Sequence, residues 1–348
     1  MNANLKEDAM PASQPLLSVI VPAYNSQDYL DRALATLVDY NDEVEVLIVN
    51  DGSKDDTARI ADEWARRHPG GVRAIHQENK GHGGAVNTGI RAANGTHVRV
   101  CDSDDWVDRP AMNRLLDLLR EECAAGRDLD LIVTNYVYEK QGKAHKTVVR
   151  YRNVLPQGKT ITWDEVKPYR YDQYMMMHSL TMRTEILRRS GLTLPEHTFY
   201  VDYLYSHTPL PLVRTIRYLD VDLYRYFIGR DDQSVNEKVM ISRLDQLLRV
   251  NREMVAAMPK PEEVPANLYR YMVHYLRINC VVTTVMAQLS GTPEHLEMKD
   301  QMWNELEATD PAAGAAVESD LLARLARSRS RRFVTAAYSL VRAVMGFN

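Results

Sequence analysis

Short runs of β-branched residues alternate with amphipathic stretches through the first part of the chain. Such alternation is typical of βαβ units, in which helices cover the faces of a parallel sheet. The predicted strands lie at residues 17–21, 44–49, 72–76, 97–101 and 129–134. Helices are predicted at 27–40, from the Asp55-Asp56 cap to 67, at 84–93 and after Pro110. We therefore predict an α/β fold with a mixed, mainly parallel sheet flanked by helices.

The order of the predicted elements changes after Tyr136, where the parallel winding is expected to stop. Residues 137–152 have the pattern of a hairpin around Gly142, followed by a helix at 183–189 and a strand at 215–226. From residue 237 onward the pattern is helical, at 239–257, 267–288, 293–307 and 312–345. We expect one α/β domain over 14–235, with halves at 14–135 and 136–235, and an all-helical C-terminal region over 236–348.

Charge and cysteine content exclude several classes of protein. The chain has 43 basic and 47 acidic residues, so it lacks the positive field of a nucleic-acid-binding protein. Cys101, Cys123 and Cys280 form no CxxC pair, which argues against a disulfide framework or a thiolate zinc site. No secretion signal precedes residue 15, and no later run is apolar over the roughly 18 residues of a membrane span. We expect a cytoplasmic protein.

The strongest local signal is the acidic run Asp102-Ser103-Asp104-Asp105, which directly follows a predicted buried strand. Carboxylates at this density repel one another unless a cation neutralises them. Oxygen ligands of this kind suit Mg²⁺ or Mn²⁺ holding a diphosphate. The alternative is a solvated acidic turn that caps the following helix.

Two further polar clusters follow the first and second predicted strands, at 22–25 and 50–53. Ligands of open α/β sheets bind beyond the carboxyl ends of the strands, where all three clusters would converge. Tyr24 offers a ring to a nucleobase, and the Asp51 carboxylate can accept a hydrogen bond from a base N–H. Each cluster alone could be a helix-capping turn. The glycine-rich stretch 80–87 could bring backbone amides near phosphate, although it matches no standard phosphate loop.

Together, the segments SVIVPAYN (18–25), NDGS (50–53), ENKGHGGAVNTGI (78–90) and DSDDW (102–106) resemble family 2 inverting glycosyltransferases over residues 16–119. The resemblance implies a glycosyltransferase-A fold whose first half binds the nucleotide and whose second half shapes the acceptor site. In the family's DxD pair, Asp102 and Asp104 would contact ribose and metal. We expect the metal at Asp104 and Asp105, where Asp105 is adjacent and could share the role, so that the assignment within the acidic run stays open. We expect the nucleotide at Pro22, Tyr24, Asp51, Lys80, Gly83, Asp102 and Ser103.

An inverting enzyme needs a general base, which this family usually supplies as a carboxylate from the second half of the domain. We assign that role to Asp202, although Val201 stands where relatives often carry a glutamate. The alternative is an aspartate that caps a helix beginning at Tyr203. His178, within a run of methionines, is interpreted as a core residue. Arg230 could offset diphosphate charge or could lie in an exposed loop. Neither is placed in the site.

We therefore predict metal-dependent transfer, with inversion, from a UDP-sugar to a hydroxyl on a glycan or lipid-linked acceptor in cell-surface polysaccharide synthesis. Two alternatives are a nucleotidyltransferase and a nucleotide-sugar-binding protein without turnover. The C-terminal sequence also allows peripheral contact with the inner face of the membrane, because basic residues precede an amphipathic stretch. They are Arg324, Arg327, Arg329, Arg331 and Arg332. Packing of that stretch on the helical region is the alternative.

Overall fold

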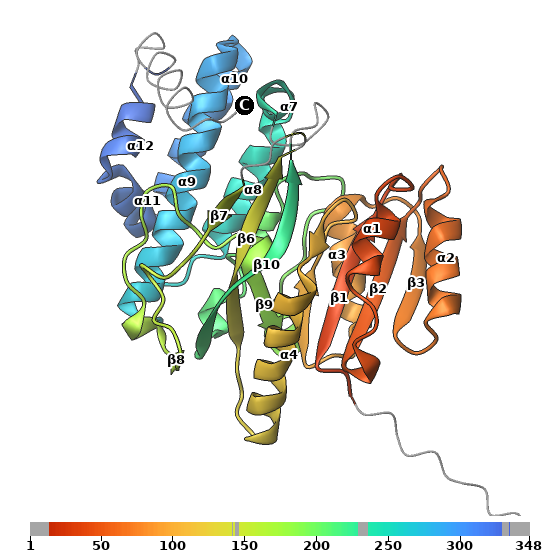
Figure 1. Cartoon of the computed structure of the whole chain (residues 1–348). Helices are drawn as coiled ribbons and strands as arrows, with labels where there is room; N and C mark the ends of the chain where they lie inside the picture. Colours follow the sequence, from red (N-terminus) through yellow and green to blue (C-terminus); the bar gives the residue numbers. More distant parts are fainter. Residues whose placement is uncertain (1–13, 141, 143–145, 229–235, 329–333, 335–348) are drawn as a thin grey trace, which may run out of the picture.

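The structure is a computed structural model that describes residues 14–140, 142, 146–228, 236–328 and 334 (Figure 1). In this part of the chain, ten strands form one sheet in the order β3-β2-β1-β4-β9-β6-β10-β5, with β7 beside β6 and β8 beside β10. The strands are β1 (Leu17–Ala23), β2 (Val44–Asp51), β3 (Val72–Gln77), β4 (His97–Val100), β5 (Trp106–Val107), β6 (Leu131–Lys140), β7 (Thr147–Val149), β8 (Thr160–Ile161), β9 (Leu180–Arg183) and β10 (Ile216–Ile228).

The first four strands along the chain pair in parallel and confirm the predicted βαβ winding. Strands β1, β2 and β4 are buried along their whole length, as expected for a sheet covered on both faces. Helix α3 lies very close to β1, because a Cβ on Gly89 would stand 2.3 Å from the Ile20 side chain. The helices of this half are α1 (Leu30–Ala35), α2 (Thr57–Arg67), α3 (Gly81–Ala92) and α4 (Arg109–Ala124).

Helix α1 is shorter than the predicted helix at 27–40. It ends at Ala35, where the Thr36 hydroxyl donates to the Ala33 carbonyl. Asp39 and Asn41 then adopt positive φ angles, which are incompatible with a continuing helix. The other three predicted helices of this half are confirmed to within a few residues of their ends.

The second half of the sheet differs from the predicted order in one respect. Strand β9 is inserted antiparallel between β4 and β6, whereas β6 and β10 pair in parallel, so parallel pairing continues beyond residue 136. The predicted hairpin is confirmed by the antiparallel pairing of β6 with β7. The short strands β5, β8 and β9 were not predicted. Strand β5 pairs with β10 and thereby places the acidic run beside the end of β10.

The region after residue 236 is helical, and in Figure 1 it lies at the opposite end of the sheet from α2 and β3. One hydrophobic core continues from the sheet into this region. The predicted helix at 239–257 is interrupted at Arg243. The helices of the helical region are α7 (Glu237–Ser242), α8 (Leu244–Ala256), α9 (Ala266–Ser290), α10 (Pro293–Thr309), α11 (Pro311–Glu318) and α12 (Leu321–Ala326). Two short helices, α5 (Thr184–Arg189) and α6 (Asp202–Tyr205), precede this region in the chain.

Only part of the predicted C-terminal basic helix lies within the described residues. Arg329, Arg331, Arg332 and most of the apolar stretch lie outside them. Arg327 pairs with Glu307 and places its guanidinium 4.6 Å from the Trp303 ring centroid, so it is engaged within the helical region. Across the described residues, none of the helices combines the length and the apolar character that a membrane span requires.

Candidate active site

The ends of β1 and β2 are tied together by hydrogen bonds between their two polar clusters. The amide of Asn25 donates to the Ser53 hydroxyl over 3.0 Å, and the Asn25 side chain accepts from the Lys54 amide over 2.9 Å. Pro22 is buried within β1, whereas Tyr24 is 51% exposed at its end. The predicted convergence of these strand ends is confirmed, and it leaves the Tyr24 ring accessible to a ligand.

Asp51 is buried at the end of β2 and organises the loop that enters α3. Its Oδ1 atom accepts from Gln77 Nε2 over 2.7 Å and from the Lys80 amide over 2.8 Å. Gly52 follows with a φ of 72°, in the left-handed region that favours glycine. Asp51 therefore has a structural role in the turn, and its predicted contact with a nucleobase remains a prediction.

The glycine-rich loop packs against a segment from the second half of the domain. A Cβ on Gly81 would stand 2.8 Å from the His197 amide nitrogen, and one on Gly83 would stand 2.8 Å from the Pro195 carbonyl. Lys80 accepts a hydrogen bond at its carbonyl from His197, and its ammonium lies 3.3 Å from Glu196. These close contacts account for the glycines at positions 81 and 83 without a bound phosphate. They also hold in place the segment that leads to Asp202. The nucleotide roles of Lys80 and Gly83 remain predictions.

Asp102 stands just beyond the end of β4, between two histidines. Its Oδ1 atom is 2.8 Å from Nε2 of His82, and its Oδ2 atom is 3.5 Å from Nε2 of His178. Burial alone would raise the pKa of Asp102, but the charges of His82 and His178 and the hydrogen bond with His82 hold it well below its usual range. Ser103 lies alongside, with its hydroxyl 2.7 Å from that of Ser26. Asp102 is therefore an ionised carboxylate.

Asp105 is fully buried and held by the strand that β5 brings alongside. Its Oδ2 atom accepts from the Tyr224 hydroxyl over 2.5 Å, and Oδ1 accepts from the Phe227 amide over 2.7 Å. Burial, together with the charges of Asp104 and Asp102, raises its pKa well above the ordinary value. Both causes act against the ionised form of this carboxyl.

His178 is a site residue that the sequence interpretation placed in the core. It lies in the 3₁₀ turn Met177–Ser179 just before β9, and its Nε2 atom is 3.8 Å from Oδ2 of Asp105. One ligand atom from each of Asp102, Asp105 and His178 fits within a group spanning 4.8 Å. Two carboxylates and an imidazole are a donor set suited to a divalent cation. Asp104 is not part of this group, and its role as a metal ligand remains a prediction.

Asp202 is the first residue of α6 and is half-buried. No side-chain hydrogen bond caps this helix at Val201, and the helix begins at Asp202 instead of Tyr203, so the capping interpretation is wrong. Burial raises the pKa of Asp202, the charges of His178 and His82 lower it, and Asp102 raises it further, with a net rise. Asp202 therefore lies close enough to the cluster around Asp102 for the charges of that cluster to change its pKa. The polar run with Arg230 lies outside the described residues.

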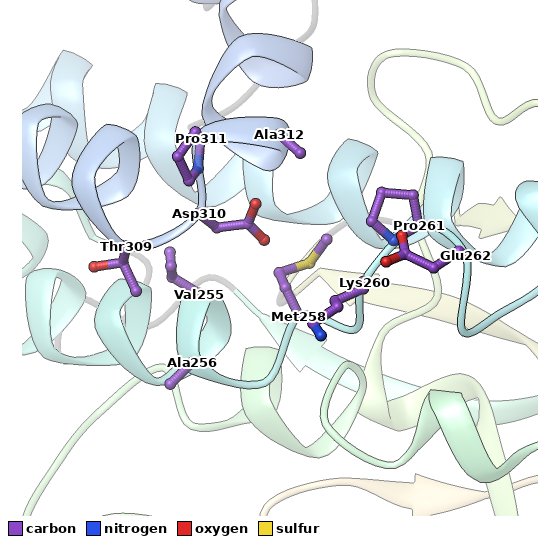
Figure 2. A pocket seen from close by; sticks show the side chains of 10 residues that line it. All are labelled: Val255, Ala256, Met258, Lys260, Pro261, Glu262, Thr309, Asp310, Pro311 and Ala312. Carbon is purple, nitrogen blue, oxygen red and sulfur yellow. The ribbon is translucent and has the colours of Figure 1, made fainter.

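A cavity of about 490 Å³ lies in the helical C-terminal region (Figure 2). It is lined by the end of α8, the residues that follow it, and the junction of α10 with α11. None of the predicted site residues lines this cavity. Its lining also lacks the cluster of facing carboxylates and imidazoles found beyond β4, so the chemistry is assigned to that cluster.

Residues 18–180 match the profile of glycosyl transferase family 2. Two Bacillus subtilis proteins named as glycosyltransferases are similar to the chain: EpsH, 29% identical over 276 residues and 74% of each chain, and EpsJ, 30% identical over 223 residues and 61% of each chain. The chondroitin synthase of Escherichia coli is 39% identical over 117 residues, which are 33% of this chain and 17% of that protein.

Among solved structures, the crystal structure of S. aureus TarS residues 1–349 in complex with UDP-GlcNAc is similar in fold. It superposes with a TM-score of 0.64 at 20% sequence identity. The superposition covers 93% of this chain and 91% of that one.

Proposed function

Because this chain belongs to glycosyl transferase family 2 and has a glycosyltransferase-A fold, we propose that it transfers a sugar, with inversion, from a UDP-sugar to a hydroxyl acceptor in a cation-dependent reaction. The observation that carries the proposal is the convergence of Asp102, Asp105 and His178 beyond β4, with Asp202 nearby. These residues combine a site for a charged diphosphate with a carboxylate suited to accept a proton. The nucleotidyltransferase interpretation finds no support in the family match.

In this proposal Asp202 accepts the proton of the acceptor hydroxyl while the hydroxyl oxygen attacks the anomeric carbon from the face opposite the leaving group. A single displacement of this kind inverts the configuration at that carbon and needs no covalent enzyme intermediate. The raised pKa of Asp202 favours the role, because a base is most effective when its pKa approaches the working pH. The charges of the neighbouring His178 and His82 act in the opposite direction and lower this pKa.

A divalent cation, Mn²⁺ or Mg²⁺, would be held by the carboxylates beyond β4 and would neutralise the charge of the departing nucleoside diphosphate. The buried Asp105 supports this role, since its carboxyl lies beside Asp102 and His178, with one ligand atom from each within 4.8 Å of the others. Tyr24, Pro22 and Asp51 would hold the nucleobase and ribose. The S. aureus structure contains UDP-GlcNAc, which is a reason to test uridine nucleotides first.

The acceptor would be a glycan or a lipid-linked saccharide, and the similarity to a chondroitin synthase supports a glycan. We expect Phe199, which is 40% exposed and three residues before Asp202, to pack against the acceptor. The Arg243 guanidinium lies 3.5 Å from the centroid of the Phe199 ring, and the Phe199 amide donates to the Gln246 side chain over 2.8 Å. The helical region thus positions the segment that carries the base. With a lipid-linked acceptor, the reaction would take place at the cytoplasmic face of the membrane.

We expect the Asp51→Asn substitution to weaken UDP binding about tenfold, the equivalent of roughly 1.5 kcal/mol for a hydrogen bond to a charged group. Asparagine keeps the Oδ1 acceptor for Gln77 and Lys80, so the turn is preserved. Titration calorimetry with UDP and Mn²⁺ measures the effect. Asp56→Asn, at an exposed aspartate that follows the same strand, is the matched control. Unchanged UDP affinity in Asp51→Asn would leave Asp51 with its turn role alone.

We expect Phe199→Ala to raise the acceptor KM about two- to tenfold at unchanged kcat, because an exposed ring contributes binding of roughly 0.5–1.5 kcal/mol without taking part in bond making. Steady-state kinetics at saturating donor measure both constants. Tyr171→Ala is the matched control, since Tyr171 is another exposed ring beneath an arginine, here Arg277 of α9. A change in donor KM instead of acceptor KM contradicts the assignment.

A further inference from the structure

His178 is a buried histidine whose ring has no hydrogen-bond partner. Its residue surface is 5% exposed, and within the described part of the chain neither ring nitrogen is hydrogen-bonded. The Nε2 atom faces Oδ2 of Asp102 at 3.5 Å and Oδ2 of Asp105 at 3.8 Å. Both distances exceed those of an ordinary hydrogen bond. A cation bound between these three atoms could contact all of them.

The imidazole is also held in this direction by its surroundings. Arg99, fully buried in β4, donates to the His178 carbonyl and, over 2.9 Å, to the Thr181 hydroxyl. Tyr224 and Tyr226 flank the ring with centroid distances of 4.6 and 4.5 Å. The ring is therefore fixed before any ligand binds, as expected for a preorganised metal ligand.

Both carboxylates have outer partners that orient them toward the same point. Asp102 binds His82 through Oδ1, which leaves Oδ2 on the side of His178. Asp105 is fixed by the Phe227 amide and by the Tyr224 hydroxyl. An oxygen that accepts one hydrogen bond keeps a second lone pair for a metal. Outer hydrogen bonds of this kind are typical of metal sites.

We propose that His178 supplies a nitrogen ligand to the cation through Nε2, beside Asp102 and Asp105, and that this ligand makes the site select Mn²⁺ over Mg²⁺. Imidazole suits transition metals, whereas Mg²⁺ takes oxygen ligands almost exclusively. The proposal presupposes the cation-dependent transfer described above. In the competing arrangement, His178 is a protonated counter-ion of the two carboxylates and Asp104 holds the cation.

The test is pulsed electron paramagnetic resonance of Mn²⁺ bound to the full chain with UDP. We expect nitrogen coupling in the wild type, and a change in its pattern when the histidines are labelled with ¹⁵N. His178→Gln should remove the coupling and lower Mn²⁺ affinity about tenfold or more, with a smaller loss for Mg²⁺. His82→Gln should keep the coupling, because His82 contacts Asp102 from the other side. His295→Gln, in α10, is the control for a distant histidine.

Bound Mn²⁺ without histidine coupling in the wild type would overturn the proposal and leave cation-dependent transfer intact. Coupling that survives in His178→Gln would overturn it as well and assign the nitrogen to another histidine. Failure of Mn²⁺ to bind, with or without UDP, would overturn this proposal, and failure of both Mn²⁺ and Mg²⁺ to bind would overturn the metal requirement as well. The labelled wild-type spectrum decides the question even where His178→Gln fails to fold.

Discussion

Asp202→Asn is expected to lower the rate of sugar transfer by about 10²- to 10⁴-fold, the usual contribution of a general base, while UDP affinity stays unchanged. Asparagine has nearly the same size but cannot accept the acceptor proton. The donor should still bind, because its predicted contacts lie at the ends of β1, β2 and β4. Steady-state transfer assays and UDP calorimetry on the same preparation measure the two effects. Circular dichroism verifies that the variant is folded.

The pH dependence gives an independent readout of the same group. Asp202 must be ionised to act, and its pKa is raised by burial, so kcat/KM should fall as the pH drops through a pKa above the ordinary aspartate value. That acidic limb should disappear from the residual activity of Asp202→Asn. Asp245→Asn, at another aspartate in the first turn of a helix, is the matched control and should keep the limb. A normal rate in Asp202→Asn would assign the base to another carboxylate.

Removal of the divalent cation is the second change with a large expected effect. In excess chelator, transfer should fall by about 10³-fold or more, because stabilisation of the leaving group by a metal is worth roughly several kcal/mol. Addition of Mn²⁺ should restore the rate. Asp102→Asn should reproduce most of the loss even with Mn²⁺ present, since Asp102 stands between His82 and His178 at the proposed cation site.

The control for this experiment is the folded state. The circular dichroism spectrum should be the same in chelator and in Mn²⁺, because the sheet is stabilised by its own hydrophobic core. Full turnover in excess chelator would show that transfer does not require a divalent cation. The charge of the leaving group would then have to be balanced by cationic side chains, such as those of His82 and His178.

The sequence predicted the first half of the fold well because its strands are long, buried and separated by amphipathic helices. Strands β1 to β4 were each placed to within about two residues of their ends. Strands β5 and β8 have two residues each and β9 has four, too short for any hydrophobic period to be read. Their existence depends on pairing with β10, β6 and β4, which are distant in sequence.

The candidate site also has residues that the sequence predicted and one that it did not. Clusters that directly follow a predicted strand, such as Asp51 and Asp102, were found because parallel strands end at one edge of a sheet. His178 was missed because its flanking methionines indicate a core position, and it is indeed buried. Only the insertion of β9 between β4 and β6 brings it to Asp102. No local sequence pattern indicated this contact, because β9 itself was too short to be predicted.

Release of nucleoside diphosphate from a panel of nucleotide-sugars, in the presence of Mn²⁺ and a mixture of glycan acceptors, tests the central claim most directly. We expect release of UDP from one UDP-sugar in preference to release from GDP-, CDP- and ADP-sugars. This release should depend on Mn²⁺ and should be lost in Asp202→Asn. Binding of UDP-sugars without release of UDP from any donor would contradict it and identify a nucleotide-sugar-binding protein instead.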